Sequence, residues 1–241
     1  MSIITFVPHG KDWILTMNFE KQLPGSLTSP KIYNELSGKL LYAKDANVVG
    51  SWLILHEKGW VGAILPAAKF YRQEPGRNFH GLYKFLYEVM RSPEPLSVIK
   101  STVLSASEPF VLILCLEHDL IEFYWNGQEL TERSLSNQKA HYWESVYTST
   151  GDLIALRSAK FFQQIENPSF ELPELVLAIH KRFGEEKQVQ ANEYPVLKPN
   201  INACVTQIVI GENLLRMYYY DFLQPQYFTQ TLVRHQEDNW W

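Results

Sequence analysis

The sequence predicts an α+β fold in which layers of antiparallel sheet are covered by helices, and three observations lead to this expectation. The first half of the chain consists largely of short apolar runs separated by turn residues, a pattern typical of hairpins and not of βαβ units. Apolar residues with helical spacing follow in the middle of the chain. Two more strand-like runs lie towards the C-terminus. Strands on both sides of a helical region favour sheets that are covered by helices.

Two hairpins are expected in the first half, at residues 3–17 and 51–65. Each consists of an apolar run, a short polar turn and a second apolar run. In the second hairpin, Gly59 can adopt the positive φ that the turn requires. The segment from Leu23 to Asn47 lies between the hairpins and contains two prolines and two glycines. This composition predicts a long surface loop.

The middle of the chain combines helices with a strand meander. Helical spacing of apolar residues predicts helices at residues 81–90, 95–104, 151–165 and 173–183. Pro93 closes the first of them, and Gly184 is expected to stop the last. Residues 110–116 and 120–125 are predicted strands, and Asn126-Gly127 predicts a type I′ turn after them.

A final hairpin is expected at residues 203–220. Because side chains alternate along a strand, Tyr219 should face away from Tyr218 and Tyr220, with one face in the core and the other in water. Core and edge packing account for these aromatic residues, although aromatic side chains also line ligand pockets. Before this hairpin, residues 185–200 are polar enough to be mobile.

Length and composition describe an ordinary globular protein. A chain of 241 residues can bury roughly 70 to 75% of the surface that its unfolded form exposes. Hydrophobic residues make up 46% and charged residues 20%, which predicts a packed core. The 22 basic and 26 acidic residues are scattered, so the net charge of −4 argues against a nucleic-acid partner. We expect one domain at residues 1–235 and a tail at 236–241.

The cysteines and the N-terminal residues indicate an intracellular protein. Cys115 and Cys204 each lie inside an apolar run, so we expect buried thiols in a reducing compartment and no disulfide. The N-terminus lacks the basic start and long apolar stretch of a secretion signal. No apolar run approaches the roughly 20 residues that a membrane span needs. The expected location is the cytoplasm.

A series of short motifs, in order along the chain, resembles the NRDE-motif family, also called the transport-and-Golgi-organization family. The eponymous tetrapeptide corresponds to residues 18–21, Asn-Phe-Glu-Lys in this chain. The other matching segments are residues 2–8, 13–17, 42–45, 50–53, 78–82, 141–147 and 204–207. The similarity therefore extends over nearly the whole chain.

Membership of this family implies a fold and a reaction type. The family is grouped with the N-terminal-nucleophile hydrolases, which implies a four-layer αββα sandwich of two antiparallel sheets flanked by helices. In such enzymes the side chain of residue 2 attacks an amide after the initiator methionine has been removed, and the freed α-amine is the base. Here that residue is Ser2. Without the resemblance, Ser2 is simply the start of an N-terminal strand.

The resemblance also implies the other site residues. Asn18 and Glu20 would complete a catalytic site with Ser2, with Asn18 and backbone amides stabilising the oxyanion. The chain departs from the family pattern at several positions: the family usually has cysteine where Ser2 stands, arginine where Phe19 stands and aspartate where Glu20 stands. It also has Pro66 where the family tends to place an asparagine, so a candidate amide donor is missing.

Two functions compete at this stage. The first is a non-catalytic or vestigial family member that binds a small or hydrophobic molecule near Phe19, Pro66 and His141. The second is an N-terminal serine amidohydrolase that uses Ser2. His141 stands in a family motif, and its alternative role is a partly buried histidine bonded to a nearby backbone group.

No cofactor or metal is expected. The seven histidines show no paired-ligand spacing. Haem is a conceivable ligand through the family resemblance alone, because any exposed histidine or cysteine could ligate it. The sequence gives no indication of an oligomeric state or of a role for Trp240 and Trp241.

Overall fold

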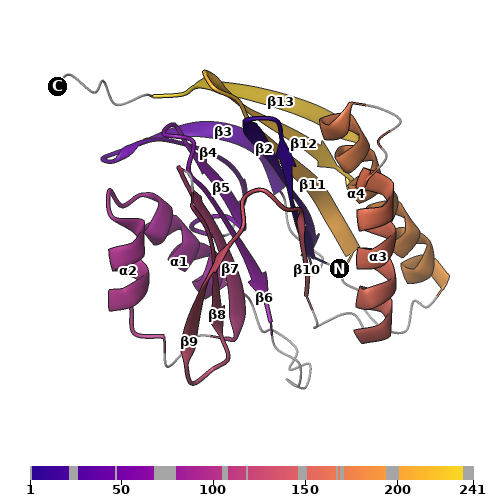
Figure 1. The fold of residues 1–241 in the computed structure, drawn as a ribbon, viewed down its shortest axis with the longest axis horizontal. Coiled ribbons are helices and arrows are strands. Elements are labelled where there is room, and N and C mark those ends of the chain that lie inside the picture. Colours follow the sequence, from indigo (N-terminus) through magenta and orange to yellow (C-terminus); the bar gives the residue numbers. More distant parts are fainter. Residues whose placement is uncertain are drawn as a thin grey trace.

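The fold is an α+β sandwich of two antiparallel sheets between layers of helices, as expected (Figure 1). The computed structural model describes residues 2–21, 27–46, 48–67, 80–104, 108–117, 119–145, 151–166, 168, 171–193 and 201–235. Sheet A comprises, in spatial order, β10 (His141–Glu144), β1 (Ile3–His9), β2 (Asp12–Lys21), β11 (Ile201–Ile210), β12 (Leu214–Asp221) and β13 (Gln226–Val233). Sheet B comprises β3 (Leu27–Glu35), β4 (Gly38–Asp45), β5 (Leu53–His56), β6 (Val61–Pro66), β7 (Phe110–Leu116), β8 (Asp119–Trp125) and β9 (Leu130–Leu135).

Helices cover the outer faces of both sheets. The described helices are α1 (His80–Met90), α2 (Pro95–Ser101), α3 (Gly151–Glu166) and α4 (Leu172–Glu193). In Figure 1, α1 and α2 lie on the outer side of sheet B, and α3 and α4 on the outer side of sheet A. Gly62 of β6 lets α1 approach closely, because a Cβ there would lie 2.7 Å from Leu86 Cδ1 and from Met90 Sδ.

The strand pattern of β1 shows how the sequence builds two cores. Ile4 and Phe6 belong to the large core between the sheets, whereas Ile3 and Val7 belong to the smaller core beneath α3 and α4. This follows from alternation, since successive side chains of a strand point to opposite faces. A continuous apolar run is therefore the sequence of a strand that is buried on both sides.

The predicted loop between the first two hairpins was wrong, because the structure has strands β3 and β4 there. Pro30 contributed to the error, since proline within sheets is confined to edge strands, strand starts and bulges. β3 is an edge strand of sheet B, and its register against β4 shifts between Thr28 and Lys31. Pro30 therefore sits at a bulge where its missing N–H is tolerated.

The predicted end of α4 at Gly184 was also wrong, because the helix runs from Leu172 to Glu193. Gly184 lies within the helix, where a Cβ would come within 2.3 Å of the Phe222 ring. The glycine permits this close approach and does not act as a stop signal. The helix occupies residues 185–193 of the segment that was expected to be mobile, and residues 194–200 lie outside the described part of the chain.

The turn at Asn126-Gly127 also differs from its prediction. A type I′ turn needs positive φ at both residues, but among the described residues only Glu117 and five glycines, Gly127 included, have it. Asn126 instead accepts hydrogen bonds through its side-chain Oδ1 from Gln128 N at 2.7 Å and Glu129 N at 2.8 Å. The asparagine therefore closes a longer turn with its side chain.

The other predicted elements are confirmed, except that the helix predicted at residues 95–104 ends at Ser101. The two early hairpins correspond to β1–β2 and β5–β6, and Gly59 has φ of +85°. The late hairpin corresponds to β11–β12, where Tyr219 is buried and its two tyrosine neighbours are half-buried. Cys115 and Cys204 are buried free thiols. The expected tail at 236–241 lies outside the described residues, and the single-domain organisation stays a prediction.

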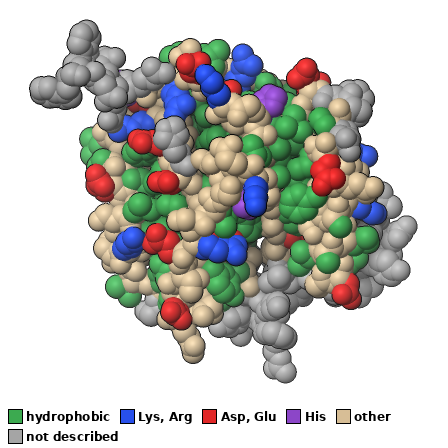
Figure 2. Space-filling model, viewed as in Figure 1, with side chains coloured by type: hydrophobic (Ala, Val, Ile, Leu, Met, Phe, Trp, Pro, Cys, Tyr) green, Lys and Arg blue, Asp and Glu red, His purple; other side chains and the backbone are tan. Residues whose placement is uncertain are grey.

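The surface in Figure 2 carries acidic and basic side chains intermixed with apolar ones. Within the described residues, no helix has the length and apolar character to span a membrane.

Candidate functional site

A pocket of about 330 Å³ lies where edge strand β10 of sheet A faces the strands of sheet B. Its lining residues come from β6 and the residue after it, from β7 and β8, and from β10 and the residue after it: Leu65, Pro66, Ala67, Val111, Tyr124, Tyr142, Trp143, Glu144 and Ser145. Leu65, Val111 and Tyr124 form one row across the strands of sheet B. The pocket therefore has an apolar and aromatic floor.

Ser2 lies beside this pocket, at the beginning of β1. Its backbone oxygen accepts a hydrogen bond from Ser145 N at 2.9 Å, so Ser2 adjoins a residue of the pocket wall. Its Oγ accepts a bond from the backbone N–H of Glu20 at 3.3 Å. The side chain is buried, and alternation with Ile4 directs it towards the space between the sheets. Ser2 and Glu20 are thus neighbours, and the contact between them uses the backbone N–H of Glu20.

Phe19 occupies the position across from Ser2. The β1–β2 register pairs Ile3 with Asn18, and one further step along both strands sets Ser2 opposite Phe19. The Phe19 ring stacks on Trp52 of the β4–β5 connection with centroids 3.8 Å apart and planes 4° apart. Both rings are buried in the core between the sheets. An aromatic stack therefore stands at this position, where the NRDE motif that residues 18–21 resemble has an arginine.

Asn18 does not join the site that was predicted for it. Because strand residues alternate, Asn18 points to the opposite face from Phe19 and lies under α4. Its Nδ2 donates to the backbone oxygen of His180 at 2.9 Å, and its Oδ1 accepts from His180 Nδ1 at 2.5 Å. Both the oxygen and the nitrogen of the amide are hydrogen-bonded on the helix side of the sheet, away from Ser2, and the oxyanion role stays a prediction.

His180 is the buried partner that sequence reasoning missed. Asn18 Nδ2 faces a carbonyl, which fixes Oδ1 as the acceptor and so places a proton on His180 Nδ1. His180 Nε2 then accepts from the Thr5 hydroxyl at 2.8 Å. Complete burial lowers the pKa of His180 from 6.5 to about 3, since desolvation disfavours the imidazolium. The ring is therefore neutral at physiological pH and holds α4 to β1 and β2.

Pro66 is among the residues that line the pocket, and its backbone oxygen is hydrogen-bonded to the opposite wall. The Ser145 hydroxyl donates to the Pro66 oxygen at 2.7 Å. This bond joins the end of β6 in sheet B to the end of β10 in sheet A, and Ser145 is buried. The sequence gives no sign of a contact between residues so far apart.

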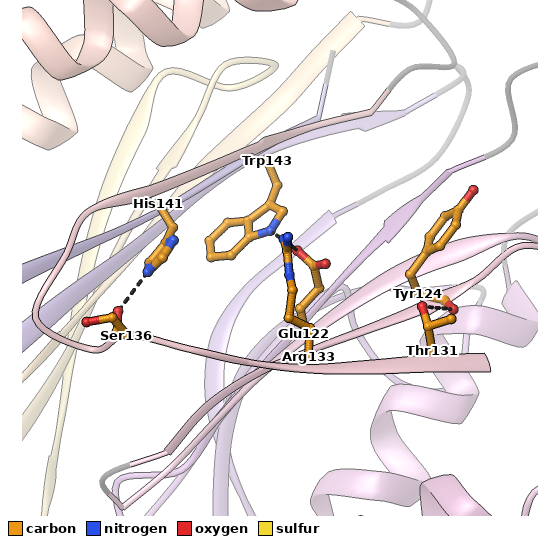
Figure 3. A network of polar contacts seen from close by, with 7 residues as sticks. All are labelled: Glu122, Tyr124, Thr131, Arg133, Ser136, His141 and Trp143. Carbon is orange, nitrogen blue, oxygen red and sulfur yellow. Dashed lines mark hydrogen bonds and ion pairs between the residues drawn. The ribbon is translucent and has the colours of Figure 1, made fainter.

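His141 lies behind the pocket wall. Its Nε2 is 2.7 Å from the backbone oxygen of Ser136, which is the backbone-bonded arrangement weighed as the alternative. Its ring stacks beside Trp143 with centroids 5.6 Å apart (Figure 3). Trp143 lines the pocket and His141 does not. The histidine thus supports the wall residue from outside.

An arginine reaches the neighbourhood of the site from α3. Arg157 Nη1 lies 2.7 Å from Glu144 Oε1, and the Glu144 side chain has no exposed surface. The Tyr142 hydroxyl donates to the other Glu144 oxygen at 2.6 Å, and burial followed by this bond raises the pKa of Tyr142. These groups lie under the helices, where Tyr142 packs against the smaller core. The cation is thus neutralised on the far face of β10.

Comparisons with known proteins place the fold. No protein-family model matches the chain, and no curated protein sequence matches it either. Among solved structures, the Caenorhabditis elegans ortholog of N-acylethanolamine-hydrolyzing acid amidase is similar, with a TM-score of 0.55 and 10% sequence identity. The match covers 86% of this chain and 92% of that chain. At this identity the likeness bears on fold and not on activity. The chain therefore has an α+β sandwich fold of the N-terminal-nucleophile-hydrolase type.

Proposed function

We propose that this protein is a non-catalytic member of its fold class that binds a small apolar ligand in the pocket beneath β10. The observation that carries the proposal is the stack of Phe19 on Trp52, which fills the position across from Ser2. An N-terminal serine is a weak nucleophile unless a base and an oxyanion-stabilising group adjoin it. A stacked phenyl ring supplies neither, and Asn18 is engaged by His180 on the other face of the sheet.

The pocket lining supports an apolar ligand. Leu65 and Val111 provide aliphatic surface, and Tyr124 and Trp143 provide aromatic surface. The volume of about 330 Å³ falls at the lower end of the roughly 300 to 1,000 Å³ that is usual for ligand pockets. A small molecule of this kind would gain about 25 cal/mol for each Å² of apolar surface that leaves water.

We also propose that the protein belongs to the NRDE-motif family and is located in the cytoplasm. The motifs at residues 2–8, 18–21 and 141–147 support membership of the NRDE-motif family. The apolar settings of Cys115 and Cys204 as free thiols support a cytoplasmic location.

A pocket-filling variant tests ligand binding. Val111→Phe adds a ring to the pocket floor and should weaken binding of 1-anilinonaphthalene-8-sulfonate at least tenfold, measured by fluorescence titration. Val103→Phe is the matched control, because Val103 is 83% exposed. It should leave the dissociation constant unchanged. Equal binding by the unmodified protein and Val111→Phe would place the dye elsewhere and remove the support for this pocket.

Haem is a separate ligand to be tested, because the family resemblance is its only motive. A haem titration followed by absorbance should give a saturable change that Val111→Phe diminishes, if haem enters the same pocket. A flat response would remove haem as a ligand and leave the apolar-ligand proposal unaffected.

A second candidate function is an N-terminal serine amidohydrolase. It is favoured by the position of Ser2, whose side chain turns towards the space between the sheets and whose backbone bonds a residue of the pocket wall. The amidase named among the similar structures gives this candidate further weight. The freed α-amine of residue 2, with an ordinary pKa of about 7.7 to 8.0, would be its base.

Turnover by Ser2→Ala separates the two functions. We expect the unmodified protein to hydrolyse no member of an N-acyl amide library, and Ser2→Ala to behave identically in liquid chromatography with mass detection. Intact-mass measurement should accompany the assay, because retention of Met1 excludes the α-amine mechanism. Hydrolysis that Ser2→Ala abolishes would establish the amidohydrolase and overturn the non-catalytic proposal.

A further inference from the structure

Trp143 in the pocket wall is held by a residue from the opposite sheet. Its indole Nε1–H donates to Glu122 Oε2 at 2.6 Å. Trp143 belongs to β10 of sheet A, and Glu122 belongs to β8 of sheet B. Figure 3 shows the indole pointing from β10 towards Glu122 and Arg133. The contact therefore bridges the two sheets at the edge where the pocket lies.

Glu122 is itself fixed by its neighbour on β9. Arg133 Nη2 donates to Glu122 Oε2 at 2.9 Å, and the two residues are direct cross-strand partners. The Glu122 side chain is only 14% exposed, whereas that of Arg133 is 65% exposed. Hydrogen bonds to an ionised acceptor are shorter and roughly twice as strong as neutral ones. The carboxylate is thus a well-oriented acceptor whose position does not depend on Trp143.

The geometry ties this contact to the shape of the pocket. Glu122 and Tyr124 lie two residues apart on β8 and so share the face that looks towards sheet A. Tyr124 and Trp143 both line the pocket. His141 packs against the other side of the indole, so that Trp143 is held between a ring and a carboxylate. Its distance from the pocket floor is therefore set by Glu122.

We propose that Glu122 is a specificity-determining residue, which fixes the width of the pocket by holding Trp143 and thereby discriminates between narrow and broad apolar ligands. This inference rests on the proposed ligand-binding function. Loss of the carboxylate leaves the indole N–H without its acceptor and lets the ring turn away from sheet B. The pocket then widens, and binding of broad ligands improves relative to narrow ones.

Two alcohols of different width provide the test. 1-Octanol and 2-naphthalenemethanol carry the same hydroxyl group on a linear chain and on a fused ring, and calorimetry gives both dissociation constants. In Glu122→Ala the dissociation constant of 2-naphthalenemethanol, divided by that of 1-octanol, should fall at least tenfold. Glu122→Gln retains an acceptor oxygen and should restore the original ratio. Glu132→Ala is the matched control, because Glu132 is a 40% exposed carboxylate on β9 that pairs with Lys100.

A second readout does not require a ligand. Hydrogen exchange of the Trp143 indole proton, followed by nuclear magnetic resonance, should be at least tenfold faster in Glu122→Ala than in the unmodified protein and unchanged in Glu132→Ala. If Glu122→Ala does not fold, Trp143→Phe removes the donor, keeps a ring, and should shift the alcohol ratio in the same direction.

The possible results distinguish failure of the ligand-binding function from failure of the role of Glu122. If the unmodified protein binds neither alcohol, both the ligand-binding function and the role of Glu122 are overturned. If it binds both and the ratio in the folded variants stays within twofold of the original, only the role of Glu122 is overturned. A tenfold shift with rescue by Glu122→Gln supports both.

Discussion

Acidification from pH 6.5 towards pH 3 is expected to destabilise the protein through His180, by roughly 1 kcal/mol for each pH unit. Burial lowers the pKa of His180 from 6.5 to about 3 in the folded state, whereas the unfolded chain keeps the ordinary value. Between these two values the unfolded state binds a proton that the folded state does not. The stabilisation is therefore complete above pH 6.5 and is lost as the pH falls.

The measurement is the free energy of unfolding in urea over this pH range, for the unmodified protein and for His180→Gln. The variant removes the titrating group, so the difference in stability between the two proteins should narrow as the pH falls. His235→Gln is the matched control, because His235 is exposed. Parallel stability curves for all three proteins would show that His180 does not titrate in the buried setting described here.

Replacement of Phe19 by arginine is expected to lower the free energy of unfolding by at least about 4 kcal/mol, since it leaves an unpaired charge in the core. Phe19 is 4% exposed and stacks on Trp52, and Tyr83 of α1 packs edge-on against it with centroids 5.8 Å apart. A guanidinium at this position would lose its hydration without gaining a carboxylate within the stack. We therefore expect that a single substitution cannot introduce the arginine of the NRDE motif without this loss of stability.

Urea denaturation followed by circular dichroism measures this loss, and Phe19→Leu is the control of similar polarity. Phe19→Leu leaves a partial cavity and should cost roughly 1 to 2 kcal/mol. An arginine variant as stable as the leucine variant would mean that the position across from Ser2 accommodates a cation. That result would remove the main argument for a non-catalytic site.

Sequence reasoning succeeds in this protein where the signal is local. The alternation in β1 and β2, the helical spacing in α1 and the turn at Gly59 each lie within a few residues of one another. These patterns report which side of an element is buried, which is a property of short segments. They were sufficient to predict the α+β character, and the family resemblance supplied the four layers.

Two of the three errors concern residues whose structural role depends on a distant part of the chain. Gly184 was taken as a helix stop because its contact with Phe222 cannot be seen in the local sequence. Pro30 suggested a loop because the edge position of β3 is a property of the whole sheet. In both cases tertiary packing overrode a correct local preference.

The candidate site shows the same division between local and distant information. The motif resemblance identified Ser2 and Pro66, which do adjoin the pocket wall. It could not show that the Asn18 amide is bonded by His180, which lies 162 residues further along the chain. The hydrogen bond from Trp143 to Glu122 could likewise not be predicted from the sequence, because it joins two different sheets.

The antiparallel pairing of β2 with β11 sets the order in which the molecule can be assembled. Trp13 lies opposite Ile210, so the central ladder of sheet A joins the beginning of the chain to a segment close to its other end. During synthesis, β1 and β2 leave the ribosome long before β11 does. Their apolar faces therefore stay incompletely covered until β11 is available. Closing so large a loop is slow, because its entropic cost precedes the contacts that compensate for it. We therefore expect β2 to lack its partner on one side until residues 201–210 have been synthesised.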